Sequence, residues 1–403
     1  MRILRVALNA IASGSLLGMR TAGLVPASSG ARLPLASIML SMALVLAGTG
    51  AGVVRADKHS LADAAYLKRI QQRMGRGVRV DSNGNGGDRN TMLLVAVDFD
   101  YPESVAYLLA HGANPGYGPH DMTPLMLAAD WDEVRIARML IKHGAPVNGT
   151  DRAGPRKPGD DQIGRGGSWT ALQEACLAGA ARVAALLIAE RADVNTTCSD
   201  GITPVYIAVR FPVILKMLLH AHAKINSANI FGITPLDHAA SLGMVDSVKL
   251  LLSAGVKVAS GRTNAMFYAA NAQTVAALFE AAPKSLKIRC HGRPPLAEAI
   301  RQWRWGAAQR MLKLGANVNQ RDTRGRTALF YAAAANSLHA TRMLLDDGAR
   351  VNMMDFRRHT ALQAALRAGT GRRRVAILLW RYLAKQATRS RDFSTAPRLP
   401  GSR

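Results

Sequence analysis

The sequence predicts an all-α solenoid, a linear stack of helix–turn–helix units, from three observations. Similar stretches recur along the chain, headed by Thr91, Thr123, Thr170, Thr203, Thr234, Asn264, Pro294, Thr327 and Thr360. Successive heads are 30 to 33 residues apart, except for one gap of 47. Apolar residues make up 49% of the chain, which is enough for a continuous core shared between neighbouring units.

The first 56 residues are expected to be a signal peptide or a membrane anchor. Residues 35–54 carry no charged side chain, and this length just spans a bilayer. A cleaved secretory signal fits the same stretch, because Val54 and Ala56 place small residues before a cleavage at Asp57. An organellar transit peptide is a third interpretation, since no Asp or Glu precedes Asp57. We therefore expect an exported protein, periplasmic or secreted after signal cleavage, or one anchored by a single membrane span.

Residues 57–87 are predicted to form a capping helix and a linker. Apolar residues recur at helical spacing between Ser60 and Arg73, so this helix can shield the open end of the stack. The following DSNGNGGD stretch, residues 81–88, has oxygen ligands at alternate positions, as in a calcium loop. Its twelfth place is Met92 where a calcium loop needs Glu, which favours a flexible Gly/Asn linker.

Within residues 88–383, each recurring residue type has a physical role. Thr at the head caps a helix N-terminus, and Pro is tolerated in the first turn. Paired Ala residues allow the two helices to approach closely, and paired Leu residues on the second helix supply the core. Gly after the second helix accepts the left-handed conformation, and Asn suits the turn that follows.

These units resemble ankyrin repeats. The Thr-Pro start of that family stands at Thr123, Thr203 and Thr234, and the Gly-Ala-x-Val-Asn ending is complete at 315–319 and 348–352. The resemblance covers about nine repeats and implies a non-catalytic scaffold that binds a protein or peptide through its concave and finger surface. Between the second and third units, residues 149–167 form a Gly- and Pro-rich insertion. Residues 384–403 are expected to be a basic, disordered tail.

The sequence departs from the family pattern in two ways. The family's His three residues after the head is missing everywhere, replaced by Met126, Gln173, Tyr206, Asp237, Phe267, Ala297, Phe330 and Gln363. Its hydrogen bonds must therefore be replaced or lost. The unit from Asn264 to Pro283 also lacks the Gly-Ala-x-Val-Asn ending, so we expect a weak point or a bend there.

The sequence gives no indication of catalysis, of a cofactor or of a metal site. Cys176, Cys198 and Cys290 lack the spacing of a zinc site or a disulfide framework. The histidines at 111, 143, 220 and 222 lie where second helices end, which favours helix capping over metal binding. No nucleophile, base and orienting group are placed together.

The candidate partner-binding residues come from the positions at which ankyrin stacks meet ligands: the fingertips and the exposed part of the first helix. They form a groove that is apolar in the middle and basic toward the C-terminus, consisting of Arg210, Phe211, Phe231, Arg289, Arg293, Arg301, Arg321, Arg324, Arg326, Arg357, Arg358 and Arg367. Because Arg pairs bidentately with carboxylates, we expect an acidic protein or peptide partner and a monomeric binder.

The net charge of +25 leaves one alternative open, a polyanion or nucleic-acid binder that uses the basic C-terminal repeats. We do not expect nucleic acid, because the sequence has no recognised nucleic-acid module or aromatic stacking platform. A membrane contact is expected only through residues 35–54.

Overall fold

The structure is a computed structural model that describes residues 51–81, 91–118, 122–150, 168–260, 263–367 and 374–390. Several predicted features lie wholly or largely outside these residues: the apolar segment 35–54 except its last four residues, the linker from 82, most of the insertion and the end of the tail. The chain divides into two compact units, Met1–Leu61 and Ala62–Arg403, and the second contains the repeats.

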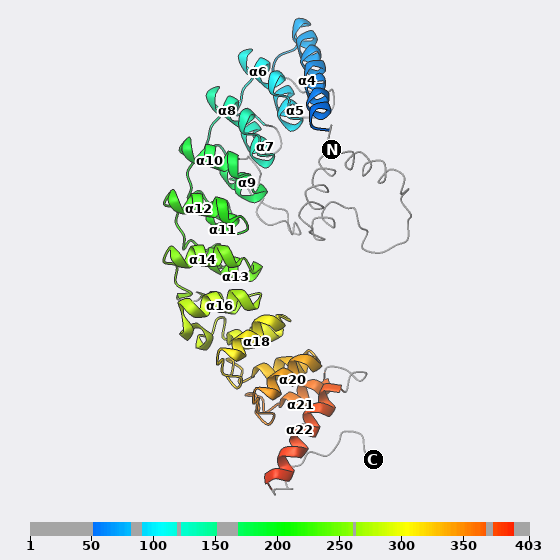
Figure 1. Ribbon diagram of the computed structural model, residues 1–403, viewed down its shortest axis with the longest axis vertical. Coiled ribbons are helices and arrows are strands. Elements are labelled where there is room, and N and C mark those ends of the chain that lie inside the picture. The colour runs from blue at the N-terminus through cyan, green and yellow to red at the C-terminus, as the bar shows by residue number, and fades with distance from the viewer. Residues whose placement is uncertain are drawn as a thin grey trace, which may run out of the picture. The chain divides into compact units, whose positions relative to one another are not determined.

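Within the described residues of the second unit, nine pairs of antiparallel helices follow one another (Figure 1). This confirms the predicted all-α solenoid. The inner, first helices are α5 (Met92–Asp98), α7 (Pro124–Asp130), α9 (Ala171–Ala178), α11 (Pro204–Ala208), α13 (Pro235–Leu242), α15 (Ala265–Tyr268), α17 (Pro295–Arg301), α19 (Ala328–Ala334) and α21 (Ala361–Arg367). The outer helices are α6 (Pro102–Ala110), α8 (Val134–Lys142), α10 (Ala181–Ala189), α12 (Pro212–His220), α14 (Val245–Ser253), α16 (Ala272–Ala281), α18 (Trp305–Lys313), α20 (Leu338–Asp346) and α22 (Arg374–Ser390).

The Thr residues at the unit heads cap the inner helices as predicted. The hydroxyl of Thr123 accepts from the Met126 backbone N–H at 3.2 Å, and Thr91, Thr170, Thr203 and Thr234 cap in the same way. Thr327 is an exception, with no side-chain cap bond, and Pro294 has no side chain able to make one. Each such cap contributes about 1 kcal/mol to helix stability.

The core is continuous from one unit to the next. The Ala pairs at 128–129, 239–240 and 332–333 are fully buried, which brings inner and outer helices close together. Leu residues on the outer helices, such as Leu140, Leu187 and Leu218, are also fully buried against neighbouring units. Burying one such side chain contributes roughly 1.5–3 kcal/mol, so each unit is stabilised mainly by its neighbours.

Outer helices end in the left-handed conformation, which Gly adopts at least cost. Gly144, Gly255, Gly315 and Gly348 have φ between 84° and 88°. At the equivalent place two units have Arg191 (φ 61°) and His222 (φ 57°).

The unit from Asn264 to Pro283, where the sequence suggests a weak point or a bend, has an irregular structure. Its inner helix α15 has only four residues, and it is preceded by a small antiparallel hairpin, β1 (Ala259–Ser260) with β2 (Thr263–Asn264). After α16 the chain forms a 3-10 helix, η1 (Pro283–Lys287). The side-chain amide of Asn264 donates to the carbonyls of Ser285 and Ile288, both at 2.9 Å. This buried amide therefore holds the irregular ending against the start of the same unit.

The missing family His is replaced in three units by another polar side chain. Gln173 Oε1 accepts from the Thr170 backbone N–H at 3.0 Å, and its amide donates to the Ile202 carbonyl of the next unit at 2.9 Å. Asp237 and Gln363 accept from the backbone of Thr234 and Thr360. At these positions the hydrogen bonds are therefore supplied by another residue.

The helix α4 (Ala51–Gly75) precedes the first unit, and its residues from Ala62 on belong to the repeat-containing part. Asp63, which is 3% exposed, accepts hydrogen bonds from the backbone N–H groups of Glu103 (2.9 Å) and Ser104 (3.1 Å). These groups open α6, which has no cap of its own from Tyr101. A carboxylate at a helix N-terminus is favourable, so Asp63 ties α4 to the first repeat.

At the other end of the described chain, α22 extends to Ser390, seven residues beyond the predicted boundary at 383. Among the described helices, none combines the length and apolar character that a membrane crossing requires.

Candidate partner-binding surface

Three of the finger loops between units have the same local hydrogen bonds. In each, a side-chain oxygen accepts from two backbone N–H groups further along the loop. Asp322 Oδ1 accepts from Arg324 and Arg326, both at 2.8 Å. Asp355 Oδ1 accepts from the second and fourth residues after it at 2.9 and 2.8 Å, and Asn229 does so at 3.0 and 2.9 Å. A short polar residue at the base therefore fixes where each tip points.

Neighbouring fingers are also joined directly through their backbones. Ile230 N–H donates to the Asp200 carbonyl at 3.0 Å, Thr323 to Gly292 at 2.9 Å, and Phe356 to Arg324 at 3.0 Å. These bonds place the tips of consecutive fingers side by side. Side chains from successive tips thus form a row across several units.

Two buried carboxylates on the inner side of this row bind predicted site arginines. Glu298 of α17, 3% exposed, accepts from Arg293 at 2.8 Å, from Arg301 at 2.6 Å and from the Gln302 amide. Burial alone would raise the pKa of Glu298, but hydrogen bonds from Arg301 and Gln302 and the charge of Arg293 hold it below its ordinary value.

The second carboxylate is Asp322, also 3% exposed. It accepts from the Tyr331 hydroxyl at 2.6 Å and forms an ion pair with Arg326 at 3.3 Å. Burial would raise the pKa of Asp322, but the bonds from Tyr331 and from the Arg326 and Arg324 backbones, with the Arg326 charge, lower it. The Arg326 guanidinium also lies 5.1 Å from the centre of the Tyr331 ring.

Eight of the ten predicted arginines consequently fall into two groups. The paired arginines, Arg293, Arg301 and Arg326, neutralise carboxylates of the protein itself. The tip arginines are exposed and form no ion pair within the described residues; they are Arg289, Arg321, Arg324, Arg357 and Arg358. Within the described residues, the tip arginines therefore keep their positive charge without a carboxylate partner.

The remaining predicted residues are arranged differently. Phe231 is 74% exposed at its fingertip. Phe211 is half-buried against the core, and its ring fills the space beside Gly179 of the preceding unit, so it has a packing role. Arg210 is exposed, and Arg367 lies 3.1 Å from His359.

The middle of the inner surface carries stacked aromatic and histidine side chains. The rings of Tyr206 and His238 lie 4.3 Å apart and nearly parallel. Burial, together with the charge of Arg210, lowers the pKa of His238 to about 4. In the next unit the Tyr268 hydroxyl lies 3.1 Å from His291 Nε2. Within the described residues, no group of three or more His, Cys, Asp or Glu is placed to hold a metal ion.

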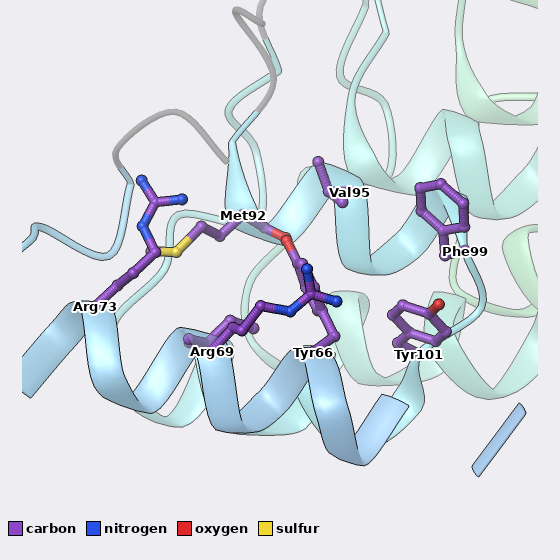
Figure 2. A pocket seen from close by; sticks show the side chains of 8 residues that line it. Tyr66, Arg69, Arg73, Met92, Val95, Phe99 and Tyr101 are labelled. Atoms are coloured by element: carbon purple, nitrogen blue, oxygen red, sulfur yellow. The ribbon is translucent and has the colours of Figure 1, made fainter. Parts of the chain in front are cut away.

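Two features of the surface were not predicted from the sequence. Phe356 is 69% exposed on the finger next to Arg357, and it could have been found because it occupies the tip position of Ile230. The other is a pocket of about 310 Å³ between α4 and α5, lined by Tyr66, Arg69, Ile70, Arg73, Met92, Val95, Phe99 and Tyr101. Figure 2 shows Tyr66, Arg69 and Arg73 on α4 facing Met92 and Val95 on α5 and Phe99 directly after it. No single repeat signals this pocket, because it requires α4.

The fold and these repeats agree with a family comparison. The ankyrin repeat family model matches three times, at residues 61–151, 172–261 and 296–388, which together are more than half of the chain. The chain belongs to the ankyrin repeat family. The unmatched gaps coincide with the Gly- and Pro-rich insertion and with the irregular unit after Asn264. Ankyrin repeats generally mediate protein–protein interactions, and proteins built from them are generally non-catalytic.

Similar proteins come from distant sources. Ankyrin repeat protein FPV031 of fowlpox virus is 30% identical over 176 residues, 41% of this chain and 48% of that protein. Neurogenic locus notch homolog protein 1 of Xenopus tropicalis is 32% identical over 133 residues, 32% of this chain and 5% of that protein. The chain thus spans about half, or much less, of these relatives. The human ASB11 ankyrin repeat domain matches with a TM-score of 0.40 and 22% identity, covering 64% of this chain and 96% of that domain.

Proposed function

We propose that this ankyrin repeat protein binds an acidic segment of a partner protein across its fingertips, without catalysing a reaction. The observation that carries the proposal is the division of the arginines into two groups. The tip arginines have no carboxylate partner within the described residues, whereas the protein's own buried carboxylates bind the paired ones. A ligand carboxylate at the tips would form the charge-assisted pairs that the fold leaves unmade.

Exposed apolar side chains lie in the same row and indicate the rest of the ligand. Ile230 and Phe231 are 64% and 74% exposed at one tip, and Phe356 is 69% exposed at another. Large aromatic side chains contribute most to interface energy when a partner covers them. The proposed ligand is therefore a segment that combines Asp or Glu with apolar residues, long enough to reach several fingers.

The test selects peptides from a displayed random library on the immobilised full chain, then measures the affinity of one synthesised winner. We expect the selected peptides to be rich in Asp and Glu. The triple variant Arg321→Glu, Arg324→Glu, Arg357→Glu should lose binding. Arg326 is left unchanged, because reversing its charge would place a Glu against Asp322 and disturb the fold.

The matched control is Lys249→Glu, Lys313→Glu, Arg342→Glu, the same charge change at exposed sites on the outer helices. It should bind as the unmodified chain does. Equal loss in both variants would mean that the net charge of +25, and not the fingertip row, attracts the peptide.

The alternative of polyanion or nucleic-acid binding is tested by comparing ligands on the same full chain. A polyanion binder would hold heparin or single-stranded DNA more tightly than the selected peptide, with an affinity that falls steeply as salt rises. That result would contradict a protein partner and support a polyanion as the ligand of the fingertips.

We further propose that the protein acts after export or at a membrane, as a monomer, on the basis of the uncharged stretch at 35–54. N-terminal sequencing of the fractionated full-length product tests this. A soluble product that starts at Asp57 would support a cleaved signal, and an intact chain in the membrane fraction would support an anchor. An intact chain in the cytosol would contradict both.

A further inference from the structure

We propose that the pocket between α4 and α5, here called the cap pocket, binds one aromatic side chain of a partner peptide together with an adjacent carboxylate. This inference goes beyond the fingertip row, because it uses different residues at the opposite end of the repeats. The cap pocket would give the protein a second point of contact with a peptide ligand.

The walls of the cap pocket are suited to an aromatic ring. The rings of Tyr66 and Tyr101 lie 5.6 Å apart at 42°, and Phe99 stacks on Tyr101 at 5.8 Å. Phe99 remains 41% exposed, so part of this residue is accessible to a ligand. A volume of about 310 Å³ lies at the lower end of the range for ligand pockets, which favours a single large side chain over a cofactor.

The rim of the cap pocket is positively charged. Arg69 is exposed, Arg73 is half-buried, and none of the residues that line the pocket is acidic. Both guanidinium charges act on the Tyr66 hydroxyl, although burial dominates and raises its pKa to about 12. A carboxylate next to the inserted ring would lie within reach of the exposed Arg69, and Arg also stacks favourably on aromatic faces.

The geometry of the pocket is fixed before any ligand arrives. The Tyr66 hydroxyl donates to the Met92 carbonyl at 3.2 Å, and Asp63, one turn earlier, holds α4 against the start of α6. Ile70, 1% exposed, anchors the same helix in the core. A pre-organised site loses less entropy on binding than one that must form around its ligand.

On the side of the first repeat, the pocket is lined by a side chain that is smaller than the tyrosine found at the same place in two other repeats. Val95 is four residues after its unit head, and the equivalent positions in two other units are Tyr268 and Tyr331. The chain itself therefore shows that a tyrosine is tolerated at this place in a repeat. Val95→Tyr is accordingly expected to fill the cap pocket without disturbing the packing of the core.

Charge complementarity points to a partner and away from the chain's own N-terminal segment. Residues 1–56 contain no Asp or Glu, so that segment has nothing to pair with Arg69 and Arg73. A second copy of the chain carries the same net charge of +25 and is repelled. An acidic peptide that bears an aromatic residue fits both the walls and the rim.

The test measures fluorescence anisotropy with the full chain and a labelled Gly/Ser peptide that contains one phenylalanine followed by two glutamates. We expect saturable binding. Replacing the phenylalanine by alanine, or the glutamates by lysines, should weaken it by at least about tenfold. Val95→Tyr and Arg69→Glu should each weaken it by at least about tenfold.

Lys68→Glu is the matched control, because Lys68 is exposed on the same helix and does not line the pocket. It should change the affinity by less than about twofold. Each variant must keep the circular dichroism spectrum and Tm of the unmodified chain. The fingertip triple variant should bind this peptide normally, so the cap pocket can fail or succeed independently of the fingertip proposal.

Three results would overturn the inference: no saturable binding by the full chain, equal binding by Val95→Tyr, or binding that appears only after residues 1–50 are deleted. The last result would mean that the chain's own N-terminal segment occupies the cap pocket.

Discussion

The inner surface of the later repeats and the fingertips beside it carry the same kind of side chain in two different electrostatic situations. On the inner surface, Arg293, Arg301 and Arg326 face buried carboxylates a few residues away. At the tips, Arg324 and Arg357 lie in loops whose own carboxylate, Asp322 or Asp355, accepts hydrogen bonds from the loop backbone. Arg293 and Arg326 both stand directly before a unit head, whereas Arg324 and Arg357 stand three residues before one. A buried acid lies opposite the first position, and this decides which arginines remain available to a ligand.

The largest test of this comparison removes one carboxylate from each of two neighbouring fingers. Asp322→Ala should lower the free energy of unfolding by about 3 kcal/mol, because it leaves Tyr331 and two backbone N–H groups without their acceptor and Arg326 without its ion pair. Asp355→Ala should cost only about 1 kcal/mol, since Asp355 is less buried and its ion-pair distance to His359 is 3.7 Å.

Urea unfolding followed by circular dichroism measures both variants. An equal or larger loss in Asp355→Ala would show that the buried carboxylate cluster on the inner surface is not what stabilises this end of the stack.

The second test uses pH on the inner surface. The folded-state pKa of His238 is about 4, below its unfolded value of 6.5, so the unfolded chain binds the additional proton first as pH falls. Stability due to neutral His238 is thus complete above pH 6.5 and is lost between about pH 6.5 and 4, by at most about 3 kcal/mol. His238→Gln should remove that part of the slope in pH-dependent thermal unfolding. A slope that persists unchanged would assign it to other groups.

Glu298 and Asp322 act at lower pH. Their folded-state pKa values are depressed, so the stability they contribute is present above their unfolded values near 4 and is lost below them. The pH range in which His238 changes stability lies mostly above the range of the two carboxylates. The His238 test can therefore be made above pH 5, where Glu298 and Asp322 stay ionised.

A third test concerns the backbone of the last finger. Gly325 has φ 80° in the finger that begins at Asp322, and the equivalent residue of the next finger is Arg358, with φ 62°. A side chain in this conformation costs roughly 1–2 kcal/mol. Arg358→Gly should therefore raise the free energy of unfolding by about 1 kcal/mol, whereas Arg357→Gly, one residue earlier, should not. Equal effects of the two substitutions would show that the change in stability comes from removing a positive charge.

The smallest effect is expected for the tip arginines themselves. Arg321→Ala and Arg324→Ala should change stability by less than about 0.5 kcal/mol, because neither side chain has an ion pair to lose within the described residues. Arg326→Ala should cost about 1 kcal/mol or more by the same measurement. If all three variants were equally harmless, the division into paired and tip arginines would have no energetic meaning.

Much of the fold followed from the sequence, because the signals are local. The head residues predicted the N-caps, and the missing Gly-Ala-x-Val-Asn ending predicted the irregular unit after Asn264. The sequence did not predict which arginines form ion pairs within the protein. Arg293 and Arg324 are both finger arginines, and only the side-chain geometry around Glu298 and Asp322 shows which of them is paired. The strain at Arg358 was visible in principle, by aligning residues 322–326 with 355–359. The cap pocket was not, because it depends on the placement of α4.

The bond between Asp63 and α6 has a consequence for how the molecule unfolds. In a linear array each unit is stabilised by the next, so unfolding begins by fraying at an end. Asp63 and Ile70 hold the helix that closes the N-terminal end, and the cap pocket lies between that helix and the first repeat. A peptide seated there would act as a latch, slowing amide hydrogen exchange in α5 and α6 while leaving α19 and α20 unchanged. Slower exchange across the N-terminal end of the repeats would then report that a peptide occupies the cap pocket.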